Sequence, residues 1–270
     1  MMEPDTNEMN GPATRRARFR VSYHGAHFHG FALNKEVATV EALLVSSIST
    51  VTRSNVELSS AGRTDTGVHS RGQVVSCDLP EDTNFHRLMR SVNGLCAPHI
   101  SISDLQWTDK DFDARRSATW REYRYTVWNA PEPNPLVFDR TWHVRHPLSL
   151  SLMNLACDGI IGHHDFTAFC RKPDLPHGDA DVSMTRYVFE ATWREDGENM
   201  VVFDIRANAF CHKMVRSLVG FFVDVGIGKR PPSDTRAVML AGDRNHGSPV
   251  APPQGLVFWD VGYDGIRIHP

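Results

Sequence analysis

Apolar side chains recur at every second position in several short stretches of the chain, which is the pattern of half-buried β-strands. This alternation, together with the turn residues between the stretches, predicts strands over residues 18–23, 56–60, 73–79, 100–107, 120–128, 186–194, 200–207 and 256–263. The strands at 186–194 and 200–207 flank Asp196-Gly197, a dipeptide typical of hairpin turns. The chain is therefore expected to contain antiparallel sheet.

Apolar spacings of three and four residues predict helices elsewhere in the chain. Thr39 is the expected N-cap of a helix that ends near residue 51, and Thr83 is the expected N-cap of a second helix. Further helices are expected over 150–161, 209–225 and 234–240. The helix over 209–225 has the clearest pattern, with a predicted core stripe of Phe210, Met214, Leu218 and Phe222 and a different face formed by Lys213, Arg216 and Gly220.

Strands and helices are mixed without strict β-α-β alternation, so the predicted fold class is α+β with mainly antiparallel sheets. A loop that contains Pro131, Pro133 and Pro135 is the expected boundary between two parts of the chain. We expect a disordered tail over residues 1–14, an N-terminal half over 15–130 and a C-terminal half over 131–270.

The composition is that of a soluble globular protein, with 41% apolar and 23% charged residues. No stretch approaches the roughly 20 consecutive apolar residues of a membrane span, and the polar N-terminus lacks the apolar block of a signal peptide. We therefore expect a cytoplasmic protein without a membrane partner. The five cysteines are odd in number and form no closely spaced pairs, which favours reduced thiols over disulfides or a zinc ribbon.

The net charge of −3 does not by itself indicate a nucleic-acid binder. Only five of the 29 cationic residues are lysines, which leaves 24 arginines. Arginine forms bidentate contacts with phosphate and stacks on bases, although a GC-rich genome also favours arginine. The charge therefore permits RNA binding without requiring it.

The segment from Ala61 to His69 carries the strongest chemical signal in the sequence. It reads Ala-Gly-Arg-Thr-Asp-Thr-Gly-Val-His, so two glycines flank a cation, two hydroxyls and one carboxylate. Glycines let a loop turn tightly or approach a ligand, and an aspartate can act as a covalent nucleophile. Such a loop could present Asp65 to a cleft, with Arg63 holding a phosphate or keeping the carboxylate ionised. On this spacing alone, an ordinary turn in which Asp65 bonds its own backbone is the favoured interpretation.

Two other segments combine cations with aromatic or apolar side chains. The segment over residues 112–125 contains Arg115, Arg121 and Tyr123, and the last two share one face of a predicted strand. This mixture suits an RNA backbone and a splayed base, and it equally suits a half-buried strand with snorkelling arginines. Lys213 and Arg216 lie near a predicted helix start, where an anionic partner would offset their unfavourable interaction with the helix dipole. Taken alone, this segment favours a solvated face instead.

No motif in the sequence indicates a cofactor or a metal ion. The histidines do not have the spacing of metal ligands on one helical face, and the residues concerned are His24, His27, His29, His163 and His164. The sequence has neither a Walker-type phosphate loop nor a dinucleotide fingerprint. We therefore expect chemistry carried by side chains alone.

Taken in order along the chain, these segments resemble the TruA family of tRNA pseudouridine synthases. The resemblance extends over residues 19–263, and the Gly-Arg-Thr-Asp-x-Gly-Val-His loop is its most specific part. The other matching blocks are residues 23–30, 112–125, 165–170, 209–220 and 251–256. The chain departs from the family at Phe31-Ala32, where Trp-Gln is usual, and at Glu41, where glutamine is usual.

The resemblance implies a pseudouridine synthase fold, with two similar halves and mixed, mainly antiparallel sheets flanked by helices around a basic RNA-binding cleft. It implies a cofactor-free homodimer that isomerises uridine to pseudouridine at positions 38, 39 or 40 of the tRNA anticodon stem-loop. The residues implied for catalysis are Asp65 as the catalytic carboxylate, Arg63 as the arginine that helps to flip the nucleotide and pairs with Asp65, and Tyr123 as the aromatic that packs against the base. Leu256 is implied as an apolar wall of the pocket, and the expected RNA contacts are Arg115, Arg121, Lys213 and Arg216.

Three alternatives stay open from the sequence. The first is a pseudouridine synthase with another RNA target, the second is a non-catalytic tRNA-binding protein on the same scaffold, and the third is a metal-dependent hydrolase that uses the histidines. A pure binder would have no need of a carboxylate in a phosphate-lined cleft, which argues against the second.

Overall fold

The computed structural model describes residues 13–171, 183–266 and 268. The strands of the first part are β1 (Thr14–Tyr23), β2 (Ser59–Ser60), β3 (His69–Pro80) and β4 (Ile100–Trp107). Those that follow are β5 (Trp120–Trp128), β6 (Trp142–His143), β7 (Gly162–Asp165), β8 (Thr185–Glu195), β9 (Met200–Ala207) and β10 (Leu256–Gly262). The helices are α1 (Val40–Thr52), α2 (Phe85–Cys96), α3 (Leu150–Cys157), α4 (Met214–Gly226) and α5 (Asp234–Ala241), and the short 3-10 turns are η1 (Gly25–His27), η2 (Asp158–Ile160), η3 (Thr167–Phe169), η4 (Arg244–His246) and η5 (Pro253–Gly255).

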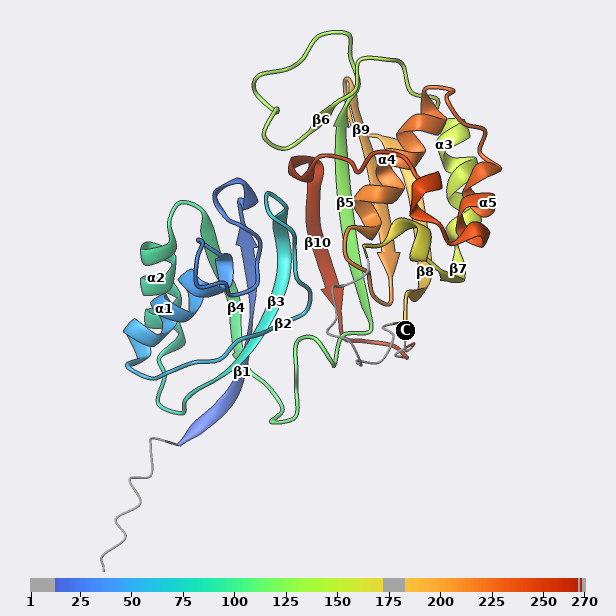
Figure 1. Ribbon diagram of the computed structural model, residues 1–270. Coiled ribbons are helices and arrows are strands. Elements are labelled where there is room, and N and C mark those ends of the chain that lie inside the picture. Colours follow the sequence, from blue (N-terminus) through green and yellow to red (C-terminus); the bar gives the residue numbers. More distant parts are fainter. Residues whose placement is uncertain (1–12, 172–182, 267, 269–270) are drawn as a thin grey trace, which may run out of the picture.

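The last strand, β10, lies in the middle of the sheet and joins its two sides. The ten strands form one sheet with the order β4-β1-β3-β10-β5-β9-β8-β7, in which β2 also pairs with β3 and β6 with β5. β10 pairs parallel with β3 and antiparallel with β5. Segments from distant parts of the chain therefore lie side by side at the centre of the molecule (Figure 1).

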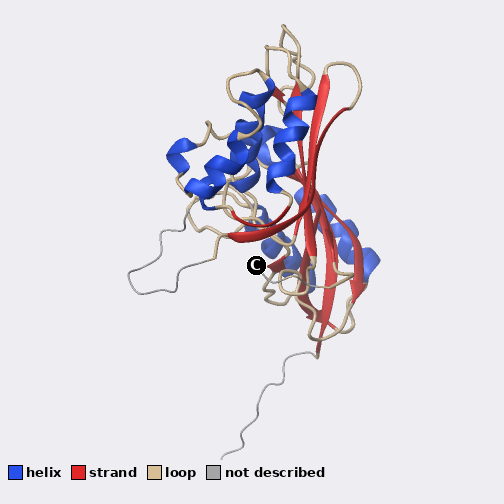
Figure 2. Cartoon of the chain, turned by 90° about the vertical axis from the view of Figure 1, so that its right-hand side faces the viewer, coloured by secondary structure: helices blue, strands red, loops and turns tan. Residues whose placement is uncertain are grey.

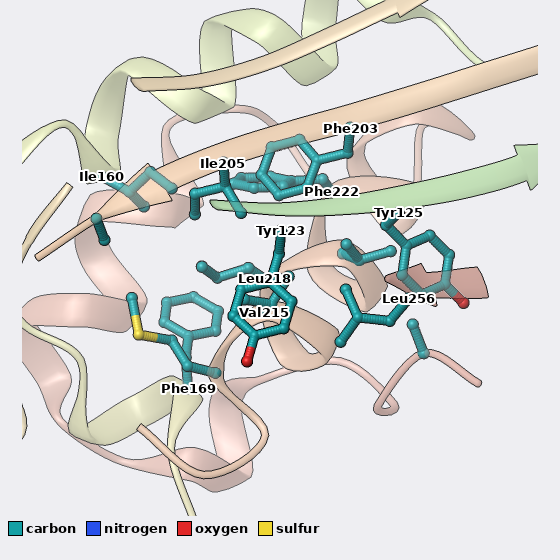
Figure 3. Packing of buried hydrophobic residues seen from close by; sticks show 14 of the residues in the cluster. Tyr123, Tyr125, Ile160, Phe169, Phe203, Ile205, Val215, Leu218, Phe222 and Leu256 are labelled. Carbon is teal, nitrogen blue, oxygen red and sulfur yellow. The ribbon is translucent and has the colours of Figure 1, made fainter. Parts of the chain in front are cut away.

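Two hydrophobic cores lie under two separate groups of helices (Figures 1 and 2). The first core joins α1 and α2 to the strands around Phe19 and Val75. The second joins α3, α4 and α5 to β5, β8, β9 and β10, and Phe203 and Phe222 are fully buried in it (Figure 3). The predicted α+β class with a mainly antiparallel sheet flanked by helices is confirmed.

The predicted helix starts are partly right. The Thr39 hydroxyl accepts a hydrogen bond from the N–H of Ala42 at 3.3 Å, so its role as N-cap of α1 is confirmed. The prediction for Thr83 is wrong by one residue, because the side chain of Asn84 caps α2 by accepting from the N–H of Arg87 at 2.9 Å.

The helix expected over residues 209–225 begins later, at Met214. Lys213 has a φ of +65°, a left-handed conformation that cannot continue a right-handed helix. Met214, Leu218 and Phe222 form the buried stripe as predicted, whereas Phe210 lies outside the helix. The helix expected over 150–161 ends at Cys157 and is followed by η2.

The predicted division into a tail and two halves can be compared with the structure only in part. The expected tail lies outside the described residues except for Ala13 and Thr14, and Thr14 already belongs to β1. β5 belongs to the expected N-terminal half, because it precedes the boundary at residues 130 and 131, but its side chains pack in the second core. The two halves remain a prediction. None of the helices in the described part of the chain combines the length and the apolar character that a membrane span requires.

Candidate active site

A cavity of about 810 Å³ lies where the loop from Ala61 to His69 faces the start of α4. All eight site residues predicted from the sequence line it, namely Asp65, Arg63, Tyr123, Arg115, Arg121, Lys213, Arg216 and Leu256. Arg186 also lines the wall, so six lysine and arginine residues stand against two carboxylates, Asp65 and Glu41, among the described lining residues. This excess of positive charge suits a polyanion such as RNA.

The loop that carries the aspartate rests directly on residues 23–30, so closely that two glycines have no room for a side chain. A Cβ atom on Gly25 would lie 2.0 Å from the carbonyl oxygen of Val68, and one on Gly30 would lie 2.8 Å from that of Thr64. Gly30 also has a φ of +93°, a left-handed conformation that favours glycine. The backbone of residues 23–30 therefore fixes the position of the loop.

Side-chain hydrogen bonds fix the loop further. The Tyr23 hydroxyl and Thr64 Oγ1 are 2.7 Å apart, and the N–H of Phe31 donates to the Thr64 carbonyl at 3.2 Å. The Gln73 amide accepts from the N–H of Gly62 at 3.2 Å and donates to the Gly62 carbonyl at 2.6 Å. A loop supported in this way holds its side chains in defined positions before any ligand binds.

The Asp65 carboxylate is held by two side chains from the far side of the cavity. Arg216 Nη1 donates to Asp65 Oδ2 at 2.9 Å, and His212 Nε2 lies 3.4 Å from Oδ1. Arg216 Nε also donates to the carbonyl of Ala251 at 2.8 Å, which fixes the guanidinium plane. The carboxylate thus bonds side chains across the cavity, in contrast to the ordinary turn in which it would accept hydrogen bonds from its own backbone.

Arg63 does not make the ion pair that was expected of it. Its side chain is exposed, and among the described residues Arg216 is the arginine that pairs with Asp65. The buried Thr64 separates the two residues in the loop, which leaves Arg63 in solvent while Asp65 turns toward α4. The role of Arg63 in flipping a nucleotide remains a prediction.

Tyr123 provides an aromatic wall close to the carboxylate. Its ring meets Phe210 edge-on at a centroid distance of 5.0 Å and Phe258 at 5.1 Å, and Leu256 extends this wall (Figure 3). Burial raises the pKa of Tyr123, and the negative charge of Asp65 adds to this effect. The hydroxyl therefore stays protonated, so Tyr123 can pack against a base or donate a hydrogen bond but is poorly suited to remove a proton.

Arg121 connects several backbone segments beside the cavity through hydrogen bonds. Its guanidinium donates to the carbonyls of Ala61 at 3.1 Å, Asn208 at 2.8 Å, Arg115 at 2.6 Å and Ala118 at 3.3 Å. These bonds tie the start of the loop to the ends of β5 and β9. Arg115 itself is exposed, and the contacts of both arginines with RNA remain predictions.

His69, at the end of the loop, is held in its neutral form. The N–H of Gly25 donates to Nδ1 at 3.0 Å, and Nε2 donates to the Asp139 carbonyl at 3.1 Å. Because a backbone N–H only donates and a carbonyl only accepts, both bonds require the neutral ring with its proton on Nε2. Burial lowers the pKa of His69, and neighbouring His24 lowers it further.

His212 and Arg186 also belong to the site, although the sequence did not indicate either of them as a site residue. His212 lies inside a segment that the sequence singled out, but only the fold shows that it contacts Asp65. Arg186 is 8% exposed, donates to the carbonyls of Ser183 and Thr185, and leaves its Nε without a hydrogen-bond partner among the described residues. Its strand position gave no sign of this location.

The clustered histidines engage one another and an aspartate. His24 Nε2 lies 3.0 Å from Asp139 Oδ2, and the rings of His27 and His99 stack at a centroid distance of 3.7 Å. Within the described residues, no group of three or more histidine, cysteine or acidic side chains has an arrangement that could hold a metal ion.

Comparisons with known proteins show what the chain is similar to. A family model described as tRNA pseudouridine synthase matches residues 156–264. Proteins named tRNA pseudouridine synthase A are similar over most of the chain: that of Streptomyces griseus is 37% identical over 259 residues, which cover 93% of this chain and 89% of the relative. That of Frankia casuarinae is 38% identical over 250 residues (92% and 89%), and that of Geobacillus kaustophilus is 35% identical over 260 residues (95% and 98%).

Proposed function

Because the chain belongs to the tRNA pseudouridine synthase A family, we propose that Asp65 is the catalytic carboxylate for isomerising uridine at position 38, 39 or 40 of the tRNA anticodon stem-loop. The family converts uridine to pseudouridine, so the chain is an isomerase that modifies tRNA. The observation that carries the role of Asp65 is its position: a carboxylate held by Arg216 inside a cavity whose other charges are mostly positive.

The reaction exchanges one bond to the sugar for another. The bond between N1 of the base and C1′ of the ribose breaks, the uracil turns, and C5 bonds to C1′. C5 loses a proton and N1 gains one, so the reaction needs neither a redox partner nor a phosphoryl donor. A carboxylate can take part as a nucleophile toward the base or the sugar, or as a base that forms a glycal.

The rest of the cavity suits a flipped nucleotide. A base in a duplex must leave its stack before its glycosidic bond can be reached, which costs a few kcal/mol and requires replacement contacts. Tyr123, Phe210 and Leu256 offer apolar surface for the base. Arg63, Arg115 and Lys213 line the same cavity as cations for the phosphates on either side.

Replacing Asp65 with asparagine tests the proposal. We expect Asp65→Asn to abolish pseudouridine formation on an anticodon stem-loop while tRNA binding survives, because the amide keeps the shape but lacks the carboxylate. Asp82→Asn, at an exposed carboxylate outside the cavity, is the matched control and should retain full activity. Turnover by Asp65→Asn would overturn the proposed role.

The target positions need their own experiment. Mapping pseudouridine in total tRNA from cells with and without this protein should show loss at positions 38, 39 or 40. Loss at another RNA site would favour the alternative of a different target, and no loss at any site would favour a binding protein without activity.

The resemblance also supports a proposal for the assembly and location. We expect a homodimer in the cytoplasm, where tRNA is modified. Light scattering coupled to size-exclusion chromatography should give twice the chain mass of 30.4 kDa. A monomer at the concentrations used for activity would contradict the expected dimer.

A further inference from the structure

Two cysteines lie on neighbouring segments at the cavity. Cys211 lines the cavity, whereas Cys170 is 2% exposed and is not among the lining residues. The N–H of Arg171 donates to the carbonyl of His212 at 2.9 Å, which holds the segments that carry the two thiols side by side. Both cysteines are free thiols in this structure.

We propose that Cys170 and Cys211 are a reversible oxidation site, in which a hydroperoxide converts the two thiols to a disulfide that alters the neighbouring active site. Cys211 is the attacking thiol because it reaches the cavity, whereas Cys170 is the buried thiol that resolves the intermediate. A cysteine that is accessible, stabilised as thiolate and adjacent to a second cysteine is the usual arrangement of a redox-sensitive site.

The surroundings act on Cys211 in both directions. The side chain of Cys170 lowers the pKa of Cys211, burial raises it, the positive charge of Arg186 lowers it and the negative charge of Asp165 raises it, with a net lowering. In the reduced protein the Cys211 thiol donates to the Met184 carbonyl at 3.7 Å, and this weak bond is given up when the thiolate forms. The pKa of Cys170 is raised by the same contact and by burial, so Cys170 stays protonated. The Nε of Arg186, which has no hydrogen-bond partner among the described residues, places an unused donor in this part of the wall.

The chemistry balances with the hydroperoxide as oxidant. The Cys211 thiolate attacks one peroxide oxygen and the O–O bond breaks, which gives a sulfenic acid and a hydroxide or alkoxide that takes up the proton lost by the thiol and leaves as water or an alcohol. The Cys170 sulfur then attacks the sulfenic sulfur, the S–S bond forms and water leaves. Two thiols and one hydroperoxide thus give one disulfide, one water and one further water or alcohol, and a dithiol reductant reverses the change.

The disulfide would act on the site through the residues beside it. Cys211 directly precedes His212, which contacts Asp65, and the N–H of Met214 at the start of α4 donates to the Cys211 carbonyl at 3.1 Å. A bond between the two sulfurs restrains this turn, and a displacement of about 1 Å at a catalytic group can cost on the order of 10²-fold in rate.

The other three cysteines serve as internal controls. Cys77 is buried and its pKa is raised to about 12 by burial. Burial likewise raises the pKa of Cys96 and of Cys157. The full-length reduced protein is treated with hydrogen peroxide for increasing times and then alkylated. We expect the fraction of Cys211 that can still be alkylated to fall about tenfold faster than that of Cys77 or Cys157.

Peptide mapping under non-reducing conditions tests the site itself, whatever the enzyme's activity. The expected result is a peptide pair linked through Cys170 and Cys211 that disappears after reduction with dithiothreitol. The variants Cys211→Ser and Cys170→Ser should lack this pair, and Cys170→Ser should instead accumulate a sulfenic acid at Cys211 that dimedone traps. Recovery of both cysteines as unlinked thiols, or first oxidation at Cys77, would overturn the proposal.

The effect on function is measured separately. Oxidation should lower the rate of pseudouridine formation by wild type at least about tenfold. Dithiothreitol should restore the rate. The rate of Cys211→Ser should not change with peroxide. A linked peptide pair without loss of activity would refute the effect on the active site while keeping the oxidation site. This readout depends on the proposed function, whereas the peptide map does not.

Discussion

Arg216 Nη1 donates to Asp65 Oδ2 at 2.9 Å, although the two residues are 151 positions apart in the chain. Both side chains are largely buried, with 13% and 23% of their surface exposed. Arg216 is in turn fixed by its bond to the Ala251 carbonyl, just before β10. The aspartate therefore receives its orientation from the two segments that complete the fold, α4 and the approach to β10.

Arg216→Lys should lower kcat by about 10²-fold, because a lysine keeps the charge but cannot bond Asp65 and the Ala251 carbonyl in one plane. The thermal unfolding midpoint should fall only slightly, since the positive charge beside the carboxylate is retained. Single-turnover kinetics on a stem-loop substrate would measure the effect. Arg236→Lys, at an exposed arginine of α5, is the control, and equal effects of the two substitutions would contradict the role of Arg216.

Gly25→Ala should lower both stability and activity, because the added methyl group would lie 2.0 Å from the Val68 carbonyl oxygen and would push away the loop that carries Asp65. Overpacking of this kind costs about 1–3 kcal/mol in the free energy of unfolding. Gly94→Ala is the matched control, since no atom lies within 4 Å of a Cβ there, and it should stabilise α2 slightly. Denaturant titration would measure both, and a Gly25→Ala variant as stable and active as Gly94→Ala would refute the tight contact.

The eight residues that line the cavity could be predicted from the sequence because the motif blocks that carry them are each short and local. The sequence did not predict how they pair. Arg63 is close to Asp65 in sequence, yet the loop leaves it exposed, and the partner comes from α4 through a sheet in which β10 inserts between β3 and β5. Long-range partners of this kind depend on the strand order, which no local pattern specifies.

The errors in the predicted elements have a similar origin. The apolar spacing of Phe210, Met214 and Leu218 is helical. However, Lys213 has a left-handed backbone conformation, so the helix begins only at Met214 and does not include Phe210. Phe210 instead packs on Tyr123 in the cavity, so a residue predicted for the core belongs to the site. Tertiary packing decided the outcome where periodicity alone favoured a longer helix.

Acid should destabilise the protein through His69. The folded state lowers the pKa of His69, because of burial and then of His24, below the value of about 6.5 for an unfolded chain. At pH values between the lowered pKa and about 6.5 the unfolded state binds more protons, so stability is fully present above pH 6.5 and is lost as the pH falls through this window. The ring faces His24 and the Asp139 carbonyl, and a proton on Nδ1 would also break the bond from the Gly25 N–H.

A titration of the unfolding midpoint between pH 8 and pH 5 would test this contribution. His69→Asn keeps an acceptor near the Gly25 N–H and removes the titrating ring, so its midpoint should fall less between these pH values than that of wild type. His163→Asn, at an exposed histidine of β7, is the control and should follow the wild-type curve. A steeper loss for His69→Asn than for wild type would contradict the sign of the effect.

Glu41→Gln should strengthen tRNA binding. Glu41 and Asp65 are the two carboxylates that line the cavity, and among them only Asp65 has an arginine partner in the described structure. Glu41 Oε2 accepts a hydrogen bond from the N–H of Leu33 at 2.7 Å, and a glutamine oxygen can accept the same bond, so the fold of this corner is kept. Removing one negative charge near bound phosphates should make the binding free energy more favourable by about 0.5–1 kcal/mol, because solvent partly screens the repulsion, and this lowers Kd about two- to fivefold.

Fluorescence anisotropy at low salt would measure the change in Kd. Glu36→Gln, an exposed neighbour that does not line the cavity, should leave Kd unchanged, and a Glu41→Gln variant that binds no tighter than Glu36→Gln would show that RNA does not approach this wall.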